Sequence, residues 1–311
     1  VFLPYAGGLF DQPSKPVVLV DAHRAEVLLV YDRVMAGSGT GIYSGAVAFD
    51  SVYHEENFRG PGYETADLVD GYITLRMQND GSLTWPYDAD DDWDNEQKTN
   101  ARLVEAHYNM GLVVDYYDSV HYRRGMDGMG GPKKCNSNAD RDRSLMCATI
   151  DYVYGPVTRN GRDYYYRVDN AYYDDGNIYL GSGVDNGPYV GLDTIAHEFT
   201  HGVSDTSAGL IYEGESGALA EHLSDAFAAA VEAHYGGDFE HVWWHGERHN
   251  TPDIAGDAGR YLDDPTRNGS PDHYADRLRL ADGELPDLEE NDLGYVHANG
   301  NIGNKVFFLA A

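Results

Sequence analysis

The stretch that decides the fold of this chain is HEFTHGVSDTSAGLIYEGESGALAEHLSDAF, residues 197–227. It begins with the pentapeptide HEFTH, in which His197 and His201 stand four residues apart. Residues at this spacing lie on one face of an α-helix, so the two imidazoles can converge on one metal ion. A catalytic zinc takes a third protein ligand and keeps one position open for water. Glu221, on the helix predicted to follow, is the carboxylate that we expect as this third ligand.

Apolar residues recur at every fourth position on both predicted helices. The stripes are Ile195, Phe199 and Val203 on the first helix and Leu219, Leu223, Phe227 and Val231 on the second. Such spacing predicts amphipathic helices that bury these stripes. The histidines lie outside the first stripe, which argues against the alternative of a chance pentapeptide with ordinary helical histidines. Asp225 shares a face with Glu221, so it can hold the ring of a ligand histidine from behind.

The segment 197–227 resembles the active-site segment of the thermolysin family of zinc endopeptidases. Further matches follow in the same order along the chain: Asn170-Ala171-Tyr172, Thr251-Pro252 through Arg260, Pro271-Asp272-His273-Tyr274, and Asp292 through His297. The resemblance implies an α+β fold with a β-rich N-terminal lobe and a mainly α-helical C-terminal lobe. The zinc site is then expected in the cleft between the two lobes.

The resemblance also implies which residues carry the chemistry. Glu198 matches the general base and acid, which takes a proton from the zinc-bound water and passes it to the leaving amine. Tyr212 and His297 match two donors to the developing oxyanion. Asp292 matches the carboxylate that orients this histidine. The alternative for His297 is an ordinary histidine on the surface.

By the same resemblance, three residues hold the backbone of an extended peptide substrate along a strand edge. They are Asn170 through its side chain, Ala171 through its main chain and Arg260 through its guanidinium. A plain surface ion pair is the alternative for Arg260. The pocket for the residue after the scissile bond is expected to be roomier and more polar than in relatives, because Thr194, His245 and Gly259 occupy its lining positions.

Acidic loops predict calcium sites, since calcium prefers several oxygen ligands. The alternating carboxylates of Asp90, Asp92 and Asp94 resemble a surface calcium site of the family. The alternative is an acidic loop that is simply solvated. A second match is formed by Asn250, Thr251, Ile254 and Asp257. The family's buried site is matched by Asp193, Glu232 and Glu247. This buried site lacks one aspartate of the family pattern, and Asp238 is the residue that could replace it.

Composition limits the possible partners. The chain has 52 acidic and 22 basic residues and a formal charge of -30, which excludes a nucleic-acid partner because phosphate contacts need Lys and Arg. No apolar run approaches the roughly 18 residues of a membrane span. Pairing of Cys135 with Cys147 would close a short loop, a constraint worth about 3 kcal/mol, and favours an oxidising compartment. Two free thiols in a reducing cytosol are the alternative.

The chain divides into three predicted regions. Residues 17–32 are predicted to form two apolar strands that resemble the last prosegment hairpin of the family. Residues 1–35 are therefore expected to be the tail of a prosegment, which inhibits the enzyme and assists its folding. Residues 36–191 form the β-rich lobe, with antiparallel strands over 42–100, a helix from Leu103 to Tyr117 and strands over 150–181. Residues 192–311 form the helical lobe, which is expected to be incomplete.

The leading hypothesis is a secreted, extracellular, monomeric zinc endopeptidase, made as a zymogen, that cleaves proteins and peptides by one-step attack of water. A catalytically inactive, calcium-stabilised binding module of the same fold is the second hypothesis. Retention of Glu198, Tyr212 and His297 argues against it. Another zinc hydrolase, such as an aminopeptidase, is the third, although no pocket for a substrate amine is evident in the sequence.

Overall fold

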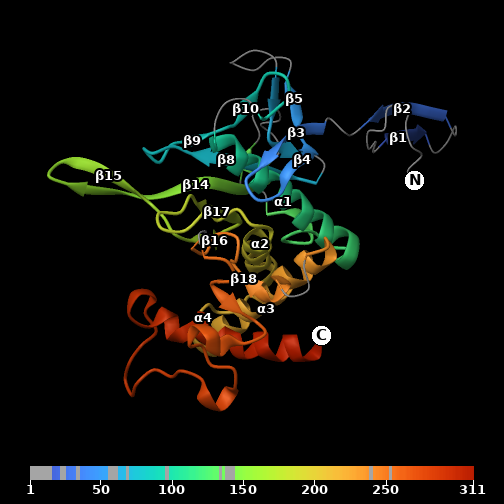
Figure 1. The fold of residues 1–311 in the computed structure, drawn as a ribbon. Helices are drawn as coiled ribbons and strands as arrows, with labels where there is room; N and C mark the ends of the chain where they lie inside the picture. The colour runs from blue at the N-terminus through green and yellow to red at the C-terminus, as the bar shows by residue number, and fades with distance from the viewer. Residues whose placement is uncertain are drawn as a thin grey trace.

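The computed structural model of the protein describes residues 16–21, 26–32, 36–54, 62–67, 70–94, 98–132, 135–136, 144–237, 241–251 and 254–311. A β-rich N-terminal lobe is followed by a helical C-terminal lobe (Figure 1), which confirms the predicted fold class. No helix in these ranges combines the length and the apolar character needed to cross a bilayer.

The chain begins with the predicted hairpin, β1 (Pro16–Asp21) and β2 (Glu26–Asp32), which pair antiparallel. This hairpin lies apart from the rest of the fold in Figure 1. A second hairpin follows, formed by β3 (Ala36–Gly41) and β4 (Gly45–Asp50). A small three-stranded sheet then has the order β10 (Tyr87–Asp88), β6 (Gly62–Glu64) and β5 (Val52–His54).

The main sheet has the order β16 (Ala171–Asp174), β17 (Asn177–Gly181), β14 (Ser144–Arg159), β8 (Tyr72–Met77) and β7 (Ala66–Asp67). Three further strands join it: β9 (Leu83–Thr84) on β8, and β13 (Cys135–Asn136) and β15 (Arg162–Arg167) on β14. The antiparallel strands predicted over 42–100 are confirmed, because the pairs formed among β5, β6, β7, β8, β9 and β10 are antiparallel. β8 also pairs with β14, which lies outside that range, and runs parallel to it. Parallel neighbours need a long crossover, and the helix between these two strands supplies it.

That helix is α1 (Lys98–His121). The apolar residues whose helical spacing predicts it are all buried: Leu103, Ala106, Met110, Val114 and Tyr117. A small parallel pair, β11 (Arg124–Gly125) and β12 (Met129–Gly131), follows it. Tyr117 connects the lobes, because its ring lies 5.1 Å from that of Phe199 and 5.6 Å from that of Phe227. Its hydroxyl also lies 2.7 Å from Thr200 Oγ1. The two helices that contain residues 199–200 and 227 therefore pack on the helix that supports the β-rich lobe.

The C-terminal lobe contains α2 (Leu192–Ser207), α3 (Gly214–His234) and α4 (Leu288–Ala310), with α3 packed against both others. Shorter elements between α3 and α4 are η1 (His241–Trp243), β18 (Trp244–His245), β19 (Arg260–Tyr261), η2 (Pro265–Asn268) and η3 (Tyr274–Asp276). The predicted stripe on α3 is wrong at Leu219, which is 47% exposed. The helix instead buries small residues at this end, including Gly217 and Ala218, which allow α4 to approach closely.

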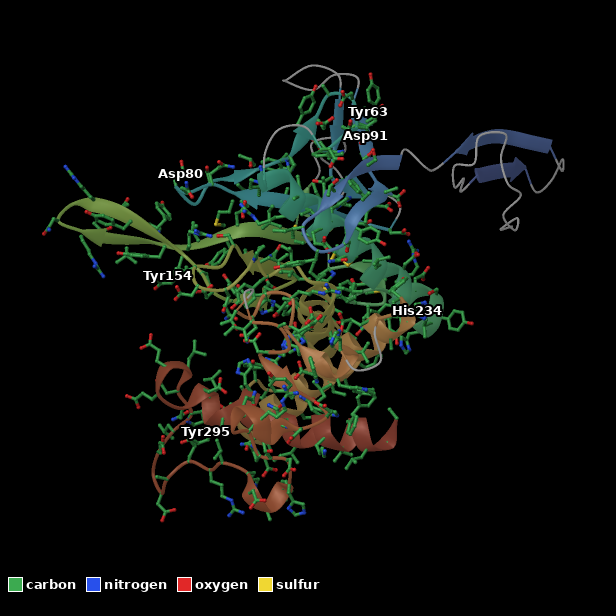
Figure 2. The ribbon with its side chains drawn as sticks, viewed as in Figure 1. Tyr63, Asp80, Asp91, Tyr154, His234 and Tyr295 are labelled. Atoms are coloured by element: carbon green, nitrogen blue, oxygen red, sulfur yellow. The ribbon has the colours of Figure 1, made fainter. Side chains whose placement is uncertain are left out.

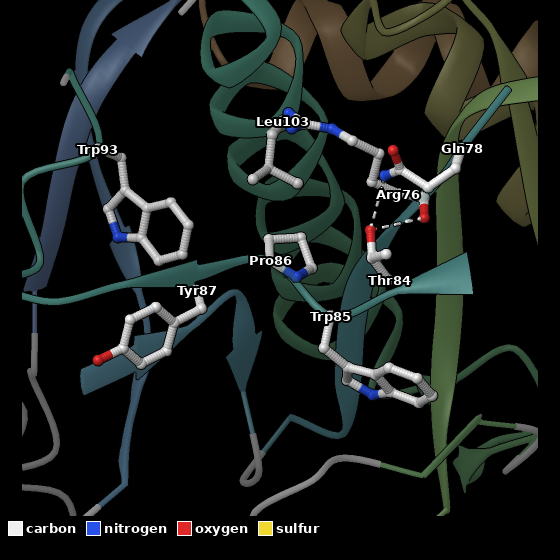
Figure 3. Close-up of a pocket in the computed structure, with 8 residues that line it drawn as sticks. All are labelled: Arg76, Gln78, Thr84, Trp85, Pro86, Tyr87, Trp93 and Leu103. Carbon is white, nitrogen blue, oxygen red and sulfur yellow. Dashed lines mark hydrogen bonds between the residues drawn. The ribbon is translucent and has the colours of Figure 1, made fainter. Parts of the chain in front are cut away.

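A hollow of about 370 Å³ lies within the β-rich lobe (Figure 3). Its lining comes from β8, the β9–β10 segment, Trp93 and the start of α1. None of the candidate catalytic or metal-binding residues lines it, so it is separate from the site described next.

Candidate active site

The three predicted zinc ligands come together where α2 meets α3. The Nε2 atoms of His197 and His201 are 3.0 Å apart. Glu221 Oε1 lies 3.2 Å from His201 Nε2, and Glu221 Oε2 lies 3.5 Å from His197 Nε2. One turn of α2 brings the two imidazoles to one face, and Glu221 projects toward them from the neighbouring helix. The ligand atoms form one of the clusters that could hold a metal ion.

The chemistry of this cluster fits zinc. Two imidazoles and one carboxylate are a ligand set that zinc uses in catalytic sites. Glu221 Oε2 is buried and has no hydrogen-bond partner among the described residues, an arrangement that is costly unless a cation lies beside it. Burial raises the pKa of Glu221, but His297, His197 and His201 outweigh burial and hold the pKa well below its usual range. The carboxylate is therefore ionised at neutral pH, as a metal ligand must be.

Asp225 lies behind the first ligand, as the sequence predicts. Its Oδ1 is 2.8 Å from His197 Nδ1, which leaves Nε2 of that ring directed at the cluster. Arg260 donates to both carboxylate oxygens, Nε to Oδ2 at 2.8 Å and Nη2 to Oδ1 at 2.7 Å. Burial raises the pKa of Asp225, but Arg260, His245 and His197 outweigh it, and the pKa lies well below its usual range. The charged carboxylate thus fixes the orientation of His197.

Arg260 is not the surface ion pair that the alternative required. Its side chain is 18% exposed, and its partner Asp225 is fully buried. Nη2 also lies 3.4 Å from His197 Nδ1, so the guanidinium belongs to the same network as the zinc ligands. A bidentate pair with a carboxylate holds the planar guanidinium in one orientation. Its role in holding substrate stays a prediction.

Tyr212 and His297 lie together beside Glu221. The Tyr212 hydroxyl donates to Glu221 Oε1 and lies 3.4 Å from His297 Nε2. Asp292 Oδ1 lies 2.7 Å from His297 Nδ1, and Asp292 Oδ2 accepts from the His297 amide at 2.9 Å. Asp292 adopts a left-handed backbone conformation, φ 51°, within a break in the helical conformation of α4. This break lets residue 292 turn its carboxylate back onto residue 297.

The protonation states of these two groups suit donors. Burial, together with the negative charges of Glu221 and Glu198, raises the pKa of Tyr212 far above its ordinary value. Burial lowers the pKa of His297, but Glu221 and Asp292 outweigh this effect and raise it. Tyr212 therefore keeps its proton at neutral pH, and the shift of His297 favours the imidazolium form, which can donate from Nε2.

The remaining predicted residues of the site lie on α2, at the start of β16 and directly before it. Glu198 is buried and follows His197 on α2. Asn170 is exposed, and its carbonyl accepts from the Gly181 amide at 3.0 Å. Ala171 begins β16, the end strand of the main sheet. An end strand presents backbone groups that an extended peptide can pair with.

The buried acidic cluster predicted to bind calcium is also present. Carboxylate oxygens of Asp193, Glu232 and Glu247 lie close enough to share one ion, and Glu247 Oε2 is buried without a hydrogen-bond partner among the described residues. Burial and the charge of Asp193 raise the pKa of Glu232 to about 10 and that of Glu247 to about 8. Arg248 Nε lies 3.3 Å from Glu247 Oε1. Asp238 lies outside the described residues.

The other two predicted calcium sites differ from each other. Asp257 Oδ2 accepts from Asn250 Nδ2 at 3.1 Å and from the Thr251 hydroxyl, and Asp257 Oδ1 is buried without a partner in the described ranges. Ile254 donates its amide to Thr251 O at 2.8 Å, so the four residues form one compact turn.

The carboxylates of the predicted surface site do not converge on one point. Asp90 and Asp92 each accept from the amide two residues later, and Asp94 accepts from the Thr40 amide. Among the described residues, these three carboxylates are not one of the groups able to share an ion. A calcium site at this loop stays a prediction without geometric support.

The proposed disulfide lies at the edge of the main sheet. Cys147 is buried in β14, and Cys135 lies in β13, the strand that pairs with β14 beside Leu145. The side chain of Cys135 lies outside the described residues, so the pairing of the two cysteines stays a prediction.

One residue of the site was not predicted from the sequence, and a second was predicted in another role. Asn304 Nδ2 donates to Asp225 Oδ2 at 2.7 Å, and Asn304 is fully buried. It lies seven residues after His297 on α4, a spacing that returns to the same helix face and could have identified it. His245 was assigned to a substrate pocket, yet its Nδ1 lies 3.6 Å from Asp193 and 3.7 Å from Asp225. No local pattern marks this position, because it depends on a loop meeting both helices.

Comparison with known proteins agrees with this geometry. A family model described as thermolysin metallopeptidase, catalytic domain, matches residues 36–205, and one described as thermolysin metallopeptidase, alpha-helical domain, matches residues 208–311. The chain belongs to the thermolysin metallopeptidase family. The resemblance found in residues 170–297 is thereby confirmed.

Several members of the thermolysin family are similar along most of the chain. Bacillolysin of Brevibacillus brevis is 31% identical over 97% of this chain and 50% of its own length. Thermolysin of Alicyclobacillus acidocaldarius is 36% identical over 83% of this chain and 39% of its own length. The chain therefore spans half or less of the length of these two relatives.

A solved structure shares the fold. The precursor of protealysin, a metalloproteinase from Serratia proteamaculans, superposes with a TM-score of 0.55 at 22% identity, over 77% of this chain and 67% of that one. At this identity the similarity supports the arrangement of a β-rich and a helical lobe.

Proposed function

We propose that this chain is a zinc-dependent endopeptidase that hydrolyses internal peptide bonds of proteins. The observation that carries the proposal is the convergence of the buried Glu221 carboxylate on the Nε2 atoms of His197 and His201, with no hydrogen-bond partner for Oε2 among the described residues. These three residues would hold the zinc. The chemistry that zinc supplies in such a ligand set is a lowered pKa of a bound water and polarisation of the substrate carbonyl.

Glu198 is the general base in this proposal. It follows a ligand histidine on α2 and is buried, and its charge raises the pKa values of Tyr212 and Arg260, which places it in the same electrostatic environment. A carboxylate in this position takes a proton from the attacking water and delivers it to the leaving amine. Proton transfer of this kind contributes about 10²- to 10⁴-fold to the rate.

Tyr212 and His297 donate hydrogen bonds to the oxygen that becomes negative as water adds to the carbonyl. Tyr212 keeps its proton, the raised pKa of His297 favours its protonated form, and both residues lie beside Glu221. Asp292 keeps Nδ1 of His297 engaged, so Nε2 is the nitrogen directed into the site. Donors fixed before the reaction stabilise the transition state without reorganisation.

The substrate backbone is held along β16, by the side chain of Asn170 and the main chain of Ala171. Arg260 supplies a third contact to a substrate carbonyl oxygen, and its pair with Asp225 keeps the guanidinium in place. Binding of an extended backbone at several points places one peptide bond beside Glu198, which is the positional requirement for hydrolysis.

The wider proposal follows the family. Calcium is held by the acidic cluster of Asp193, Glu232 and Glu247 and by the turn around Asp257. The chain acts outside the cell as a monomer on proteins and peptides, and residues 1–35 are the tail of a prosegment that inhibits the enzyme. The lobes are divided near residue 192.

The decisive experiment compares the wild type with Glu198→Gln for bound zinc and for cleavage of an internally quenched peptide blocked at both ends. We expect equal zinc content and a loss of kcat of about 10²- to 10⁴-fold. Glu289→Gln, an exposed change of the same kind, serves as the control and should keep full activity.

Other outcomes separate the competing hypotheses. A wild type that holds zinc but does not cleave the peptide would support the inactive binding module. Cleavage only after the amino terminus is unblocked would support an aminopeptidase.

A further inference from the structure

The outer half of β14 and all of β15 form an arm, residues Val153–Arg167, that projects beyond the main sheet (Figure 1). The two strands pair antiparallel from Val153↔Arg167 to Arg159↔Arg162, with an irregularity between Tyr154 and Val157. Every residue of β15 except Tyr165 is exposed. A two-stranded hairpin that buries so little surface does not need aromatic residues for packing. Exposed aromatic residues of this kind indicate a binding surface.

One face of the arm carries tyrosines and arginines. Tyr154 and Tyr166 are cross-strand partners, as are Arg159 and Arg162, and Tyr164 lies between them on β15. Tyr154 is 61% exposed, and the guanidinium of Arg159 lies 5.9 Å from the centre of the Tyr166 ring. Tyrosine and arginine dominate the energetics of binding surfaces, because each combines a large contact area with a polar group.

The root of the arm is fixed to the body of the lobe. Tyr165 points to the opposite face, where its ring packs against Gly81 in the turn between β8 and β9; a Cβ at residue 81 would lie 2.7 Å from that ring. Arg167 donates from Nε to Ser182 Oγ at 2.9 Å and from Nη2 to Ser182 O at 3.2 Å. The exposed face is thus held in position relative to the sheet.

The arm leads directly to the proposed substrate strand. Only Val168 and Asp169 separate its end from Asn170, and Asp169 is tied to the amides of Val184 and Asp185. A strand extends about 3.3 Å per residue, so Tyr166 lies about 13 Å and Arg162 about 26 Å from Asn170 along the chain. An extended substrate covers the same length in roughly four to eight residues.

The charge of the arm is opposite to that of the molecule. The arm contains three arginines and one aspartate, a formal charge of +2, in a chain with a net charge of -30. Asp163 is engaged by the Thr158 hydroxyl at 2.6 Å, while Arg159 and Arg162 form no ion pair within the ranges that the structure describes. A long polyanion would extend over the acidic surface of the rest of the molecule and be repelled by it. A short acidic segment would interact with the arm alone, because charges are screened beyond about 8 Å at physiological ionic strength.

We propose that the arm binds an acidic segment of the protein substrate, four to eight residues from the bond that is cut. The segment's carboxylates pair with Arg159 and Arg162, and its backbone and apolar atoms pack on Tyr154 and Tyr166. The inference rests on the proposed endopeptidase function and adds a preference for substrates that carry acidic residues at this distance.

The first test compares quenched, end-blocked peptides that share one core. One set is extended by an Asp/Glu-rich segment four to eight residues from the scissile bond, on either side, and a matched set carries Ser and Gln there. We expect the wild type to cleave one acidic peptide with a kcat/KM about fivefold higher than its neutral match. The preference should fall in 0.5 M salt and disappear in Arg159→Gln/Arg162→Gln, with cleavage of the core unchanged.

Matched variants exclude general effects. Arg279→Gln and Tyr122→Ser alter exposed residues of the same types elsewhere and should keep the preference. Arg159→Lys/Arg162→Lys keeps the charge and should keep most of the preference, whereas Tyr154→Ser/Tyr166→Ser should lose it. Equal cleavage of acidic and neutral peptides by the wild type would overturn the proposal.

A second test does not depend on activity. A fluorescein-labelled acidic peptide is titrated into Glu198→Gln with and without the two arginine changes, and the Kd is read from anisotropy. We expect the Kd to rise about fivefold when both arginines are replaced. An unchanged Kd would overturn the proposal, as would arginine-dependent binding of anionic phospholipid vesicles or an acidic polysaccharide in place of the peptide. If the wild type cleaves no peptide at all but the arginine-dependent Kd is observed, the endopeptidase function fails and the acidic-peptide surface stands.

Discussion

Helices α2 and α3 build two clusters of buried acidic groups whose electrostatics are opposite. In the first cluster, Glu221 faces His197 and His201, and its pKa lies well below the ordinary value. In the second, Glu232 faces other carboxylates, and its pKa is raised to about 10. Both glutamates belong to α3 and both are largely shielded from water, so their neighbours account for the difference.

The difference shows what each cluster requires from a cation. The protein itself supplies the positive partners that keep Glu221 and Asp225 ionised. The same carboxylates raise the pKa of His197 to about 10, so a metal ion that binds here must displace a proton from this ring. In the second cluster Arg248 lies near the edge and backbone amides donate to Asp193, but the carboxylates repel one another. We therefore expect the first cluster to determine activity and the second to determine stability.

The largest expected effect is at the first cluster. Replacing His201 with alanine leaves one imidazole and one carboxylate, which is too few ligands for a catalytic zinc. We expect zinc to be lost from the purified protein and kcat/KM to fall by at least about 10³-fold, because the lowered water pKa is lost with it. Zinc is measured by mass spectrometry beside the peptide assay. His234→Ala, an exposed change on α3, is the control, and comparable losses in both variants would break the comparison.

The next effect concerns the residues behind the zinc ligands. Asp225→Asn removes the charge that orients His197 and pairs with Arg260, so we expect zinc affinity to fall by about 10- to 100-fold. Asn304→Ala removes one hydrogen bond to Asp225 and should lower zinc affinity less. Competition with a zinc-binding dye gives both values. An effect of Asn304→Ala equal to that of Asp225→Asn would contradict the assigned order.

The chemical core of the site could be predicted from the sequence because it depends on local periodicity. A helix places His197 and His201 on one face whatever surrounds them, and the following helix fixes Glu221 and Asp225 in the same way. The stripe on α1 was predictable for the same reason, and all five of its residues are buried.

Features that depend on contacts between distant segments could not be predicted. Leu219 was expected in the core, but the close approach of α4 to Gly217 and Ala218 leaves it in solvent. The parallel pairing of β8 with β14 depends on how α1 crosses the sheet. His245 reaches Asp193 and Asp225 only because β18 lies against α2 and α3. The break in α4 at Asp292 also has no signal in the spacing of apolar residues.

Calcium removal should affect stability in a pH-dependent way. The folded pKa values of Glu247 and Glu232, about 8 and about 10, exceed the value of about 4.3 for an unfolded glutamate. The metal-free fold therefore holds protons that the unfolded chain releases, so the contribution of these two glutamates to stability is greatest below about pH 4 and falls as pH rises toward 8 and 10. Calcium replaces those protons, and at a hundredfold excess over its Kd it adds about 2.7 kcal/mol.

The measurement is the melting temperature with EGTA and with calcium, at pH 6 and at pH 8.5. We expect the difference between the two conditions to be larger at pH 8.5. A difference that is equal at both pH values would show that these carboxylates are not the calcium ligands.

The smallest effect tests the second cluster alone. Glu232→Gln keeps the shape of the side chain and removes a group that must take up a proton on folding at pH 8.5, because the folded pKa of Glu232 is about 10. Without calcium we therefore expect the substitution to stabilise the fold by about 1 kcal/mol. It should also weaken the response of the melting temperature to calcium and leave kcat for the core peptide unchanged, because Glu232 does not contact the zinc cluster. Glu215→Gln, an exposed change on the same helix, should do neither. If Glu232→Gln instead destabilises the metal-free protein, attraction to Arg248 outweighs repulsion within the cluster, and the contrast between the two clusters would be one of degree rather than of sign.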